Sequence, residues 1–219
     1  MRSYINNYNS AHGTHFKLWD FWGVGDGGVI DPSGNPTGIN LYAPTYDYSQ
    51  TDAESLFLTW TSTEEYWTTV RNRIMGSFEV IAFKSCFVQN NIQADEELQQ
   101  RKDWYSGMRS FFDLHPEKLF VVISLPTQTP LETTATQAAY ARAFANWLKS
   151  SAYLSGHPNV VCFDLFDYLA SPDNDSSEAN MLRPEYRGVD PHDSHPNTLA
   201  NQTVGPIFAQ FLINAALNY

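Results

Sequence analysis

Three short and almost uninterrupted apolar runs, separated by stretches long enough for helices, constrain the fold of this chain more than any other feature. They occupy residues 78–83, 119–124 and 160–165 and are rich in valine, isoleucine and phenylalanine. Such continuous hydrophobicity is typical of strands that are buried on both faces of a sheet. Strands that alternate with helices pair in parallel through crossover connections. The sequence therefore predicts an α/β protein, a three-layer α/β/α sandwich around a mainly parallel sheet.

Cap and turn signals place helices between these runs. Ser62 with Glu65 three residues later has the capping-box pattern, which predicts a helix that runs to Met75 and stops at Gly76. Three further stretches are long enough for helices, and the last follows a proline, which suits a first helical turn. These stretches cover residues 94–114, 136–154 and 197–217.

Length and charge limit the number of domains and the kinds of partner that the chain is expected to have. With 219 residues, and with no internal repeat, residues 1–219 are expected to form one domain. The formal net charge of −11 has no basic patch to offset it, which argues against nucleic acid or an anionic membrane as a partner. No run of about 20 apolar residues is present to span a bilayer. The expected partner is an uncharged or cationic small molecule, and the oligomeric state stays open.

The compartment also stays open. The first residues lack the apolar stretch of a signal peptide, so secretion or a periplasmic location would require such a peptide upstream of Met1, and the cytoplasm is expected otherwise. Cys86 and Cys162 lie in or beside apolar runs without a Cys-x-x-Cys spacing, and we expect both to be small core residues.

A long loop is predicted over residues 23–48, which are rich in glycine, proline, aspartate and tyrosine. Aromatic residues frame it, among them Trp22 and Tyr42. Two interpretations are open. The aromatic side chains either anchor surface turns by burial, or form a lip that faces the substrate, since aromatic faces stack on sugar rings.

The residues best suited to chemistry gather ahead of the last predicted helix, where Asp190, His192, Asp193 and His195 fall within six positions. Imidazole titrates near neutral pH, and a neighbouring carboxylate fixes its tautomer and stabilises its cation. Side chains two apart in an extended segment share a face, so we expect Asp193 to hydrogen-bond His195. This pair suits the general base of a hydrolase. The alternative is that His195 only caps or packs at the start of the helix.

A metal site in this cluster is not expected. The pair of Asp190 and His192 is a weaker candidate than Asp193 and His195. These four side chains are so close in sequence that they could not all converge on one metal ion without a further ligand from another part of the chain.

A second group of polar residues follows the apolar run that ends at Phe83. Amides at the carboxyl end of a buried strand can point donors into a crevice, so Asn90 and Asn91 are candidates for an oxyanion hole, with Ser85 as a further candidate. Either asparagine could equally cap the next helix. Cys86 is a possible nucleophile, but its apolar neighbours favour the unreactive thiol.

Together these segments resemble a bacterial branch of the SGNH/GDSL hydrolases. The most specific pieces are Lys84-Ser85-Cys86-Phe87 with the trailing Asn91-Ile92, and Asp193-Ser194-His195-Pro196-Asn197; residues 144–148 add to the likeness, which extends from about Tyr4 onward. The resemblance implies a flavodoxin-like sandwich that uses a Ser-His-Asp triad and no cofactor. The implied reaction is hydrolysis of esters on acylated small molecules or carbohydrates.

Carried over to this chain, the resemblance makes His195 the general base, Asp193 its orienting carboxylate and Asn90 or Asn91 the oxyanion donor. In most of the superfamily the acid stands three residues before the histidine. Here that position is His192, which leaves Asp190 as the alternative acid.

The resemblance gives no nucleophile within this chain. In the family the serine follows the first strand and precedes a helix, and this sequence begins in a segment that matches that helix. Gly25-Asp26-Gly27 mimics the serine block but has glycine in place of serine. We expect the nucleophile upstream of Met1. The alternatives are a relative without a nucleophile that only binds glycans or other ligands, and a different alignment of the N-terminus. Without the first strand, residues 14–19 would be the segment to pair beside the run at 78–83.

Overall fold

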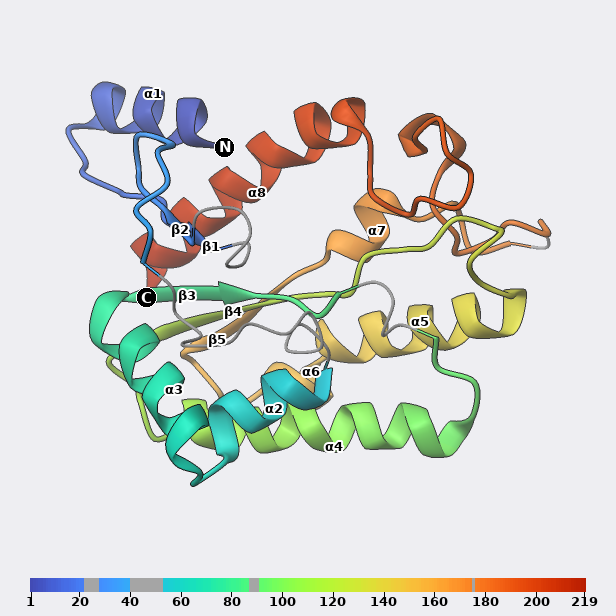
Figure 1. Cartoon of the computed structure of the whole chain (residues 1–219), viewed down its shortest axis with the longest axis horizontal. Helices are drawn as coiled ribbons and strands as arrows, with labels where there is room; N and C mark the ends of the chain where they lie inside the picture. Colours follow the sequence, from blue (N-terminus) through green and yellow to red (C-terminus); the bar gives the residue numbers. More distant parts are fainter. Residues whose placement is uncertain (22–27, 40–52, 87–90, 175) are drawn as a thin grey trace.

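A three-stranded parallel sheet forms the centre of the structure, a computed structural model that describes residues 1–21, 28–39, 53–86, 91–174 and 176–219 (Figure 1). The strands lie in the order β3, β4, β5. Their bounds are Val80–Phe83 for β3, Leu119–Ile123 for β4 and Val160–Phe163 for β5. Each falls within one of the three predicted apolar runs, and the predicted parallel pairing is confirmed.

The central strand explains the continuous hydrophobicity of its sequence. The side chains of Phe120, Val121 and Val122 are fully buried. Alternate side chains of a strand point to opposite faces, so burial on both faces demands an apolar residue at every position. Phe120 and Val122 pack in the larger core on one face of the sheet, and Val121 packs in a second core on the other.

Helices cover both faces of the sheet (Figure 1), which makes the chain a mixed α/β protein compatible with an α/β/α layout. The larger core is built mainly from one set of helices: α2 (Ala53–Thr61), α3 (Glu65–Ser77), α4 (Asp95–Phe112), α5 (Ala135–Leu148) and the short α6 (Ser151–Leu154). The remaining helices are α1 (Arg2–His12), α7 (Leu165–Leu169) and α8 (Thr198–Asn218). Helix α8 packs on the second core, and α1 packs on α8 through Ile5.

Trp60 of α2 lies at the centre of the larger core. It is 2 % exposed, and its ring lies 5.2 Å from that of Phe112 and 5.6 Å from that of Phe120, in both cases edge-on. Helix α2 comes close to α4 at Gly107, where an added Cβ would lie 2.7 Å from the ring of Phe57. Aromatic packing of this kind supplies a large part of the stability of a core.

Two predicted helix boundaries are wrong. No capping box forms at Ser62, because its hydroxyl accepts from the backbone N–H of Glu64; helix α3 begins after Glu64 and continues through Gly76. The predicted helix over 136–154 is two helices, since the chain turns at 149–150 between α5 and α6. A complete capping box instead opens α5, where Thr134 and Gln137 bond each other's backbone N–H groups.

Residues 14–19 do not form the expected strand beside β3. Within the described chain β3 pairs with β4, whereas Asp20–Phe21 (β1) pairs with Val29–Ile30 (β2) in a separate two-stranded sheet. Helices α2 and α7 have no counterpart in the sequence-based prediction. Among the residues that the structure describes, no helix is long and apolar enough to cross a membrane.

The predicted long loop over 23–48 is described only at residues 28–39. Gly28, directly before β2, has a φ of +76° and lies so close to the Ile39 carbonyl that there is no room for a side chain. The backbone N–H of Val29 donates to the same carbonyl at 2.8 Å. Trp22 and Tyr42, the candidate substrate lip, lie outside the described residues.

Candidate active site

The structure brings His195 and Asp193 together on the segment that precedes α8. One carboxylate oxygen of Asp193 lies 2.6 Å from Nδ1 of His195 and accepts from the backbone N–H of His195 at 2.8 Å. Both side chains are accessible, at 71 % and 45 % exposed. The segment lies at the same end of the molecule as the carboxyl ends of the strands, on the right of Figure 1. Functional groups of parallel α/β sheets gather at this end.

The contacts of Asp193 favour its charged form. The backbone N–H of His195, and then its imidazole, hold the pKa of Asp193 below the ordinary carboxyl value of 3.8. An ionised Asp193 accepts the Nδ1 proton and so leaves Nε2 of His195 as the basic nitrogen. That is the tautomer in which the imidazole can take a proton from a hydroxyl.

We expect the Asp193 carboxyl to titrate with a midpoint below 3.8, measured by carbon-detected NMR. A depressed pKa means that these contacts stabilise the folded segment above the unfolded value and that this contribution is lost as the pH falls through the lower, folded value. His195→Ala keeps the backbone donor, so it should raise the midpoint only part of the way to 3.8. A midpoint at or above 3.8 in the unmodified protein would contradict the geometry.

The neighbouring pair does not join this site as an alternative acid. Asp190 accepts from the backbone N–H of His192 at 2.9 Å, as a turn residue. The Nδ1 of His192 lies 2.7 Å from Glu132, a carboxylate that comes from the segment after β4. The geometry thus favours Asp193 over Asp190 as the partner of His195, and it gives His192 a partner that its sequence position did not indicate.

Ser194 and Asn197 fasten the segment to the rest of the fold. Ser194 is 2 % exposed, and its hydroxyl accepts from the backbone N–H of Thr129 at 3.0 Å. The side chain of Asn197 donates to the carbonyls of Glu185 and Arg187, each at 2.9 Å, and caps α8 by accepting from the N–H of Ala200. Asn197, rather than His195, is therefore the N-cap of the last helix.

The segment after β4 is a buried support for this region. Residues 124–129 are all buried, although they form neither helix nor strand. The Gln128 carbonyl accepts from the N–H of Leu182 at 2.8 Å. The hydroxyls of Thr127 and Thr129 are buried and have no hydrogen-bond partner within the described chain. A buried irregular segment must satisfy its backbone groups through such tertiary contacts.

The structure describes two of the three candidate oxyanion residues that follow β3. Ser85 is 3 % exposed, and its side chain lies near the hydroxyl of the buried Tyr105. Asn91 is partly buried, and its Oδ1 has no hydrogen-bond partner within the part of the chain that the structure describes. Asn90 lies outside that part. Ser85 is held inside the fold. The unpartnered atom of Asn91 is a carbonyl oxygen, an acceptor, so any donation from Asn91 to an oxyanion would have to come from its side-chain NH₂ group.

Three serines near the carboxyl ends of the strands are unsuited to act as the nucleophile. Ser124, at 0 % exposed, accepts from the N–H of Phe166 at 2.9 Å and donates to Asp164. Ser85 and Ser194 are equally enclosed. A nucleophile must reach the substrate carbonyl, and these three serines are buried, with the hydroxyls of Ser124 and Ser194 also engaged in structural hydrogen bonds.

The cysteines are partly buried. Burial raises the pKa of the Cys162 thiol to about 12, so that it is protonated at neutral pH and a poor nucleophile.

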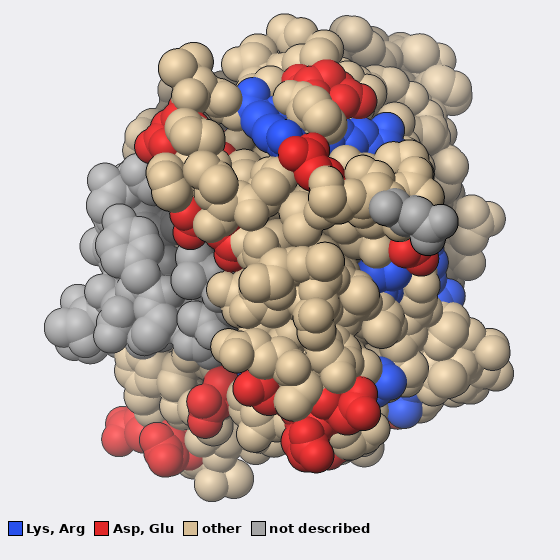
Figure 2. Space-filling view, turned by 90° about the vertical axis from the view of Figure 1, so that its right-hand side faces the viewer, with Lys and Arg blue, Asp and Glu red and all other residues tan. Residues whose placement is uncertain are grey.

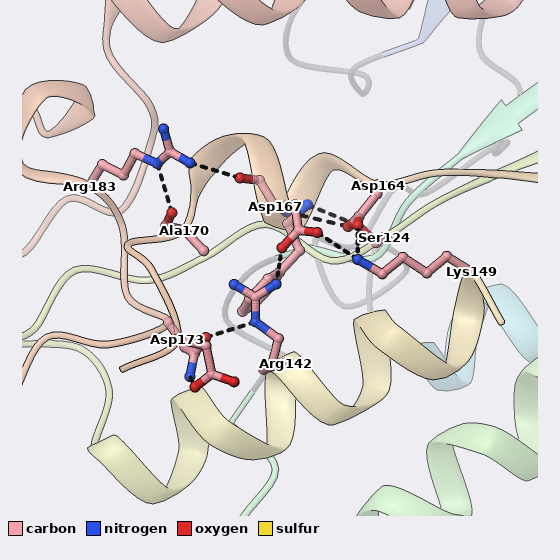
Figure 3. Close-up of polar contacts among 10 residues, drawn as sticks. Ser124, Arg142, Lys149, Asp164, Asp167, Ala170, Asp173 and Arg183 are labelled. Carbon is pink, nitrogen blue, oxygen red and sulfur yellow. Dashed lines mark hydrogen bonds and ion pairs between the residues drawn. The ribbon is translucent and has the colours of Figure 1, made fainter. Parts of the chain in front are cut away.

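A network of charged side chains that the sequence did not predict lies at the end of β5 (Figure 3). Lys149, which follows the last residue of α5, pairs with Asp164 and with Asp167, the latter at 2.5 Å, and Arg142 of α5 pairs with Asp167. Arg142 also donates to Asn180 at 2.7 Å. These contacts tie α7 and the loop that follows it to α5. Because both carboxylates are already paired with cations, we interpret the network as structural.

The end of the molecule with the candidate site carries mostly acidic charge. Figure 2 shows acidic side chains gathered along the lower part of this face, with lysine and arginine in smaller patches. The first turn of α4, which begins at this end, contributes Asp95, Glu96 and Glu97. Acidic residues in a first turn are stabilised by the helix dipole. Within the described ranges no three histidine, cysteine or acidic side chains are grouped to hold a metal ion.

Comparisons with family models, with curated proteins and with solved structures found no match for this chain. The chemical capacity of the site is therefore argued from its geometry. An accessible imidazole whose Nδ1 is held by a carboxylate can accept a proton at Nε2 and return it, which is the function of a general base and acid.

Proposed function

We propose that this protein is a serine ester hydrolase of the SGNH type, with a flavodoxin-like sandwich, that acts on acylated small molecules or carbohydrates. The observation that carries the proposal is the 2.6 Å contact between His195 Nδ1 and Asp193, on an exposed segment at the carboxyl end of a parallel sheet. The resemblance of the blocks at 84–87 and 193–197 to that family supports it.

In the proposed reaction His195 Nε2 takes the proton of a serine hydroxyl while the serine Oγ bonds to the ester carbonyl carbon. Asp193 stabilises the imidazolium that forms. The proton then passes to the leaving alcohol oxygen, and a water molecule, deprotonated by His195, releases the acid from the acyl-enzyme. Asn91 is the described candidate to donate to the oxyanion. The serine itself is not identified among the described residues.

A ligand-binding protein without turnover is the second candidate. One observation favours it: Ser85, Ser124 and Ser194 are all buried, and the hydroxyls of Ser124 and Ser194 are hydrogen-bonded. In this case the same end of the sheet would bind an acylated compound or a glycan, and His195 would contribute a hydrogen bond instead of a proton transfer.

Labelling with a fluorophosphonate, which reacts with activated serines, separates the two candidates. The enzyme proposal expects a covalent adduct on one serine, located by mass spectrometry of peptides, together with turnover of a short fluorogenic ester. Both signals should be lost in His195→Ala and retained in His12→Ala, which changes an exposed histidine of α1. Turnover that survives in His195→Ala, or an adduct that forms without His195, would refute the assignment of the base.

A further inference from the structure

Ser194 stands between the two members of the candidate dyad but faces the opposite way. The side chains of His195 and Asp193 are 71 % and 45 % exposed, whereas Ser194 is 2 % exposed. Asp193 accepts from the N–H of His195, so the three residues form a tight turn in which the two outer side chains lie together and Ser194 faces the fold. The burial of Ser194 therefore determines that its two neighbours face solvent.

The partner of Ser194 belongs to the buried interior of the fold. Its hydroxyl accepts from the backbone N–H of Thr129, which is itself fully buried and 65 residues away in sequence. Thr129 ends the buried run 124–129, which continues directly from the central strand β4. The hydrogen bond thus connects the candidate dyad to the middle of the sheet.

The hydrogen bond of Ser194 differs in kind from the contact between Asp193 and His195. Asp193 and His195 are two residues apart, so their contact is local and can form wherever the segment lies. The contact from Ser194 to Thr129 is long-range and sets where the segment lies relative to the carboxyl ends of the strands. The contact with Asp193 orients the imidazole of His195, and the contact of Ser194 with Thr129 fixes the position of the imidazole relative to the sheet.

We propose that Ser194 is a positioning residue, which holds the His195–Asp193 dyad at the correct place over the sheet. The catalytic meaning of this role rests on the proposed esterase function, whereas the positional role is independent of it. Loss of the Ser194 hydroxyl leaves the buried N–H of Thr129 without its acceptor and loosens the segment. The contacts of His192 with Glu132 and of Asn197 with Glu185 and Arg187 still hold the segment in part, and the dyad itself stays formed. A displacement of about 1 Å is enough to lower turnover by up to about 100-fold.

The test compares Ser194→Ala with the unmodified protein. In Ser194→Ala we expect the heteronuclear NOE of the backbone amides of 192–195 to fall and the amide of Thr129 to exchange faster. The nitrogen shifts of His195 should still report a proton on Nδ1. With a fluorogenic ester we expect kcat to fall about 10- to 100-fold while KM changes little. Ser194→Cys, close in size and with a weak sulfur acceptor, should give intermediate values.

Ser124→Ala is the matched control, because it also removes a buried serine hydroxyl that accepts a backbone N–H. The donor in this case is Phe166 of α7, so the change does not touch a hydrogen bond of the dyad segment. It should lower the melting temperature as Ser194→Ala does without changing the mobility of 192–195. Unchanged amide dynamics in Ser194→Ala, or equal changes in the two variants, would overturn the positioning role. These NMR results are decisive even if the unmodified protein hydrolyses no ester, an outcome that would count against the esterase proposal alone.

Discussion

Replacing His195 with alanine is expected to lower kcat/KM for a short fluorogenic ester by about 10²- to 10⁴-fold, the range that general acid–base catalysis supplies. Without the imidazole, the serine proton has no acceptor as the bond to the carbonyl carbon forms. Asp193 cannot replace it, because its pKa is held low and it is a weak base. The fold should be unaffected, since the side chain of His195 is 71 % exposed.

Two companion variants make this prediction specific. His192→Ala removes a neighbouring imidazole that is bonded to Glu132, and it should retain most of the activity. Asp193→Asn keeps the size of the side chain but removes its charge, so it should lose activity by a large factor, as expected for an imidazole that is no longer held in the correct tautomer. If His192→Ala were the more damaging variant, the base would have been assigned to the wrong histidine.

Trp60→Ala is expected to lower the free energy of unfolding by about 3–5 kcal/mol, as do other replacements of a large buried aromatic residue by alanine. Trp60 is 2 % exposed and is in contact distance of four aromatic rings, those of Phe83, Phe111, Phe112 and Phe120. Its removal would leave a cavity where α2 and α4 meet β4. Urea unfolding followed by circular dichroism measures the loss.

Trp60→Phe provides the control for this change. The indole Nε1 of Trp60 is buried and has no hydrogen-bond partner among the described residues, so phenylalanine gives up no hydrogen bond and keeps most of the ring contacts. We expect a much smaller loss of stability than with alanine. Equal losses in the two variants would contradict the idea that the ring contacts which phenylalanine keeps account for most of the stabilisation.

The strands were predictable because burial on both faces leaves a continuous apolar run, as in β4. Helix α2 was not predicted because it follows a stretch of turn residues, although Thr51 and Glu54 have the capping-box spacing in the sequence. Its reason to be helical is tertiary, namely the contacts of Trp60 and the close approach at Gly107. The capping box at Thr134 and Gln137 has the same spacing as the pattern at Ser62 and could have been found from the sequence.

The candidate site shows the same division between local and long-range information. The contact of Asp193 with His195 follows from a spacing of two residues, and it was predictable. The contacts from Ser194 to Thr129 and from His192 to Glu132 span 65 and 60 residues, and nothing in the local sequence indicates them. The nucleophile could be placed neither by the sequence nor by the described residues.

The parallel order of the sheet has a consequence for how the chain folds. Val80 pairs with Leu119 and Phe120 pairs with Val160, so each strand pairing joins residues about forty positions apart. Each pairing must close a long loop before its contacts can stabilise it, which makes such sheets slow to form. Helices α4 and α5 lie inside these loops and need only local hydrogen bonds. We therefore expect these helices to form early and to bring the ends of the strands closer together. Assembly of β3, β4 and β5 into the sheet should then be the slow step of folding.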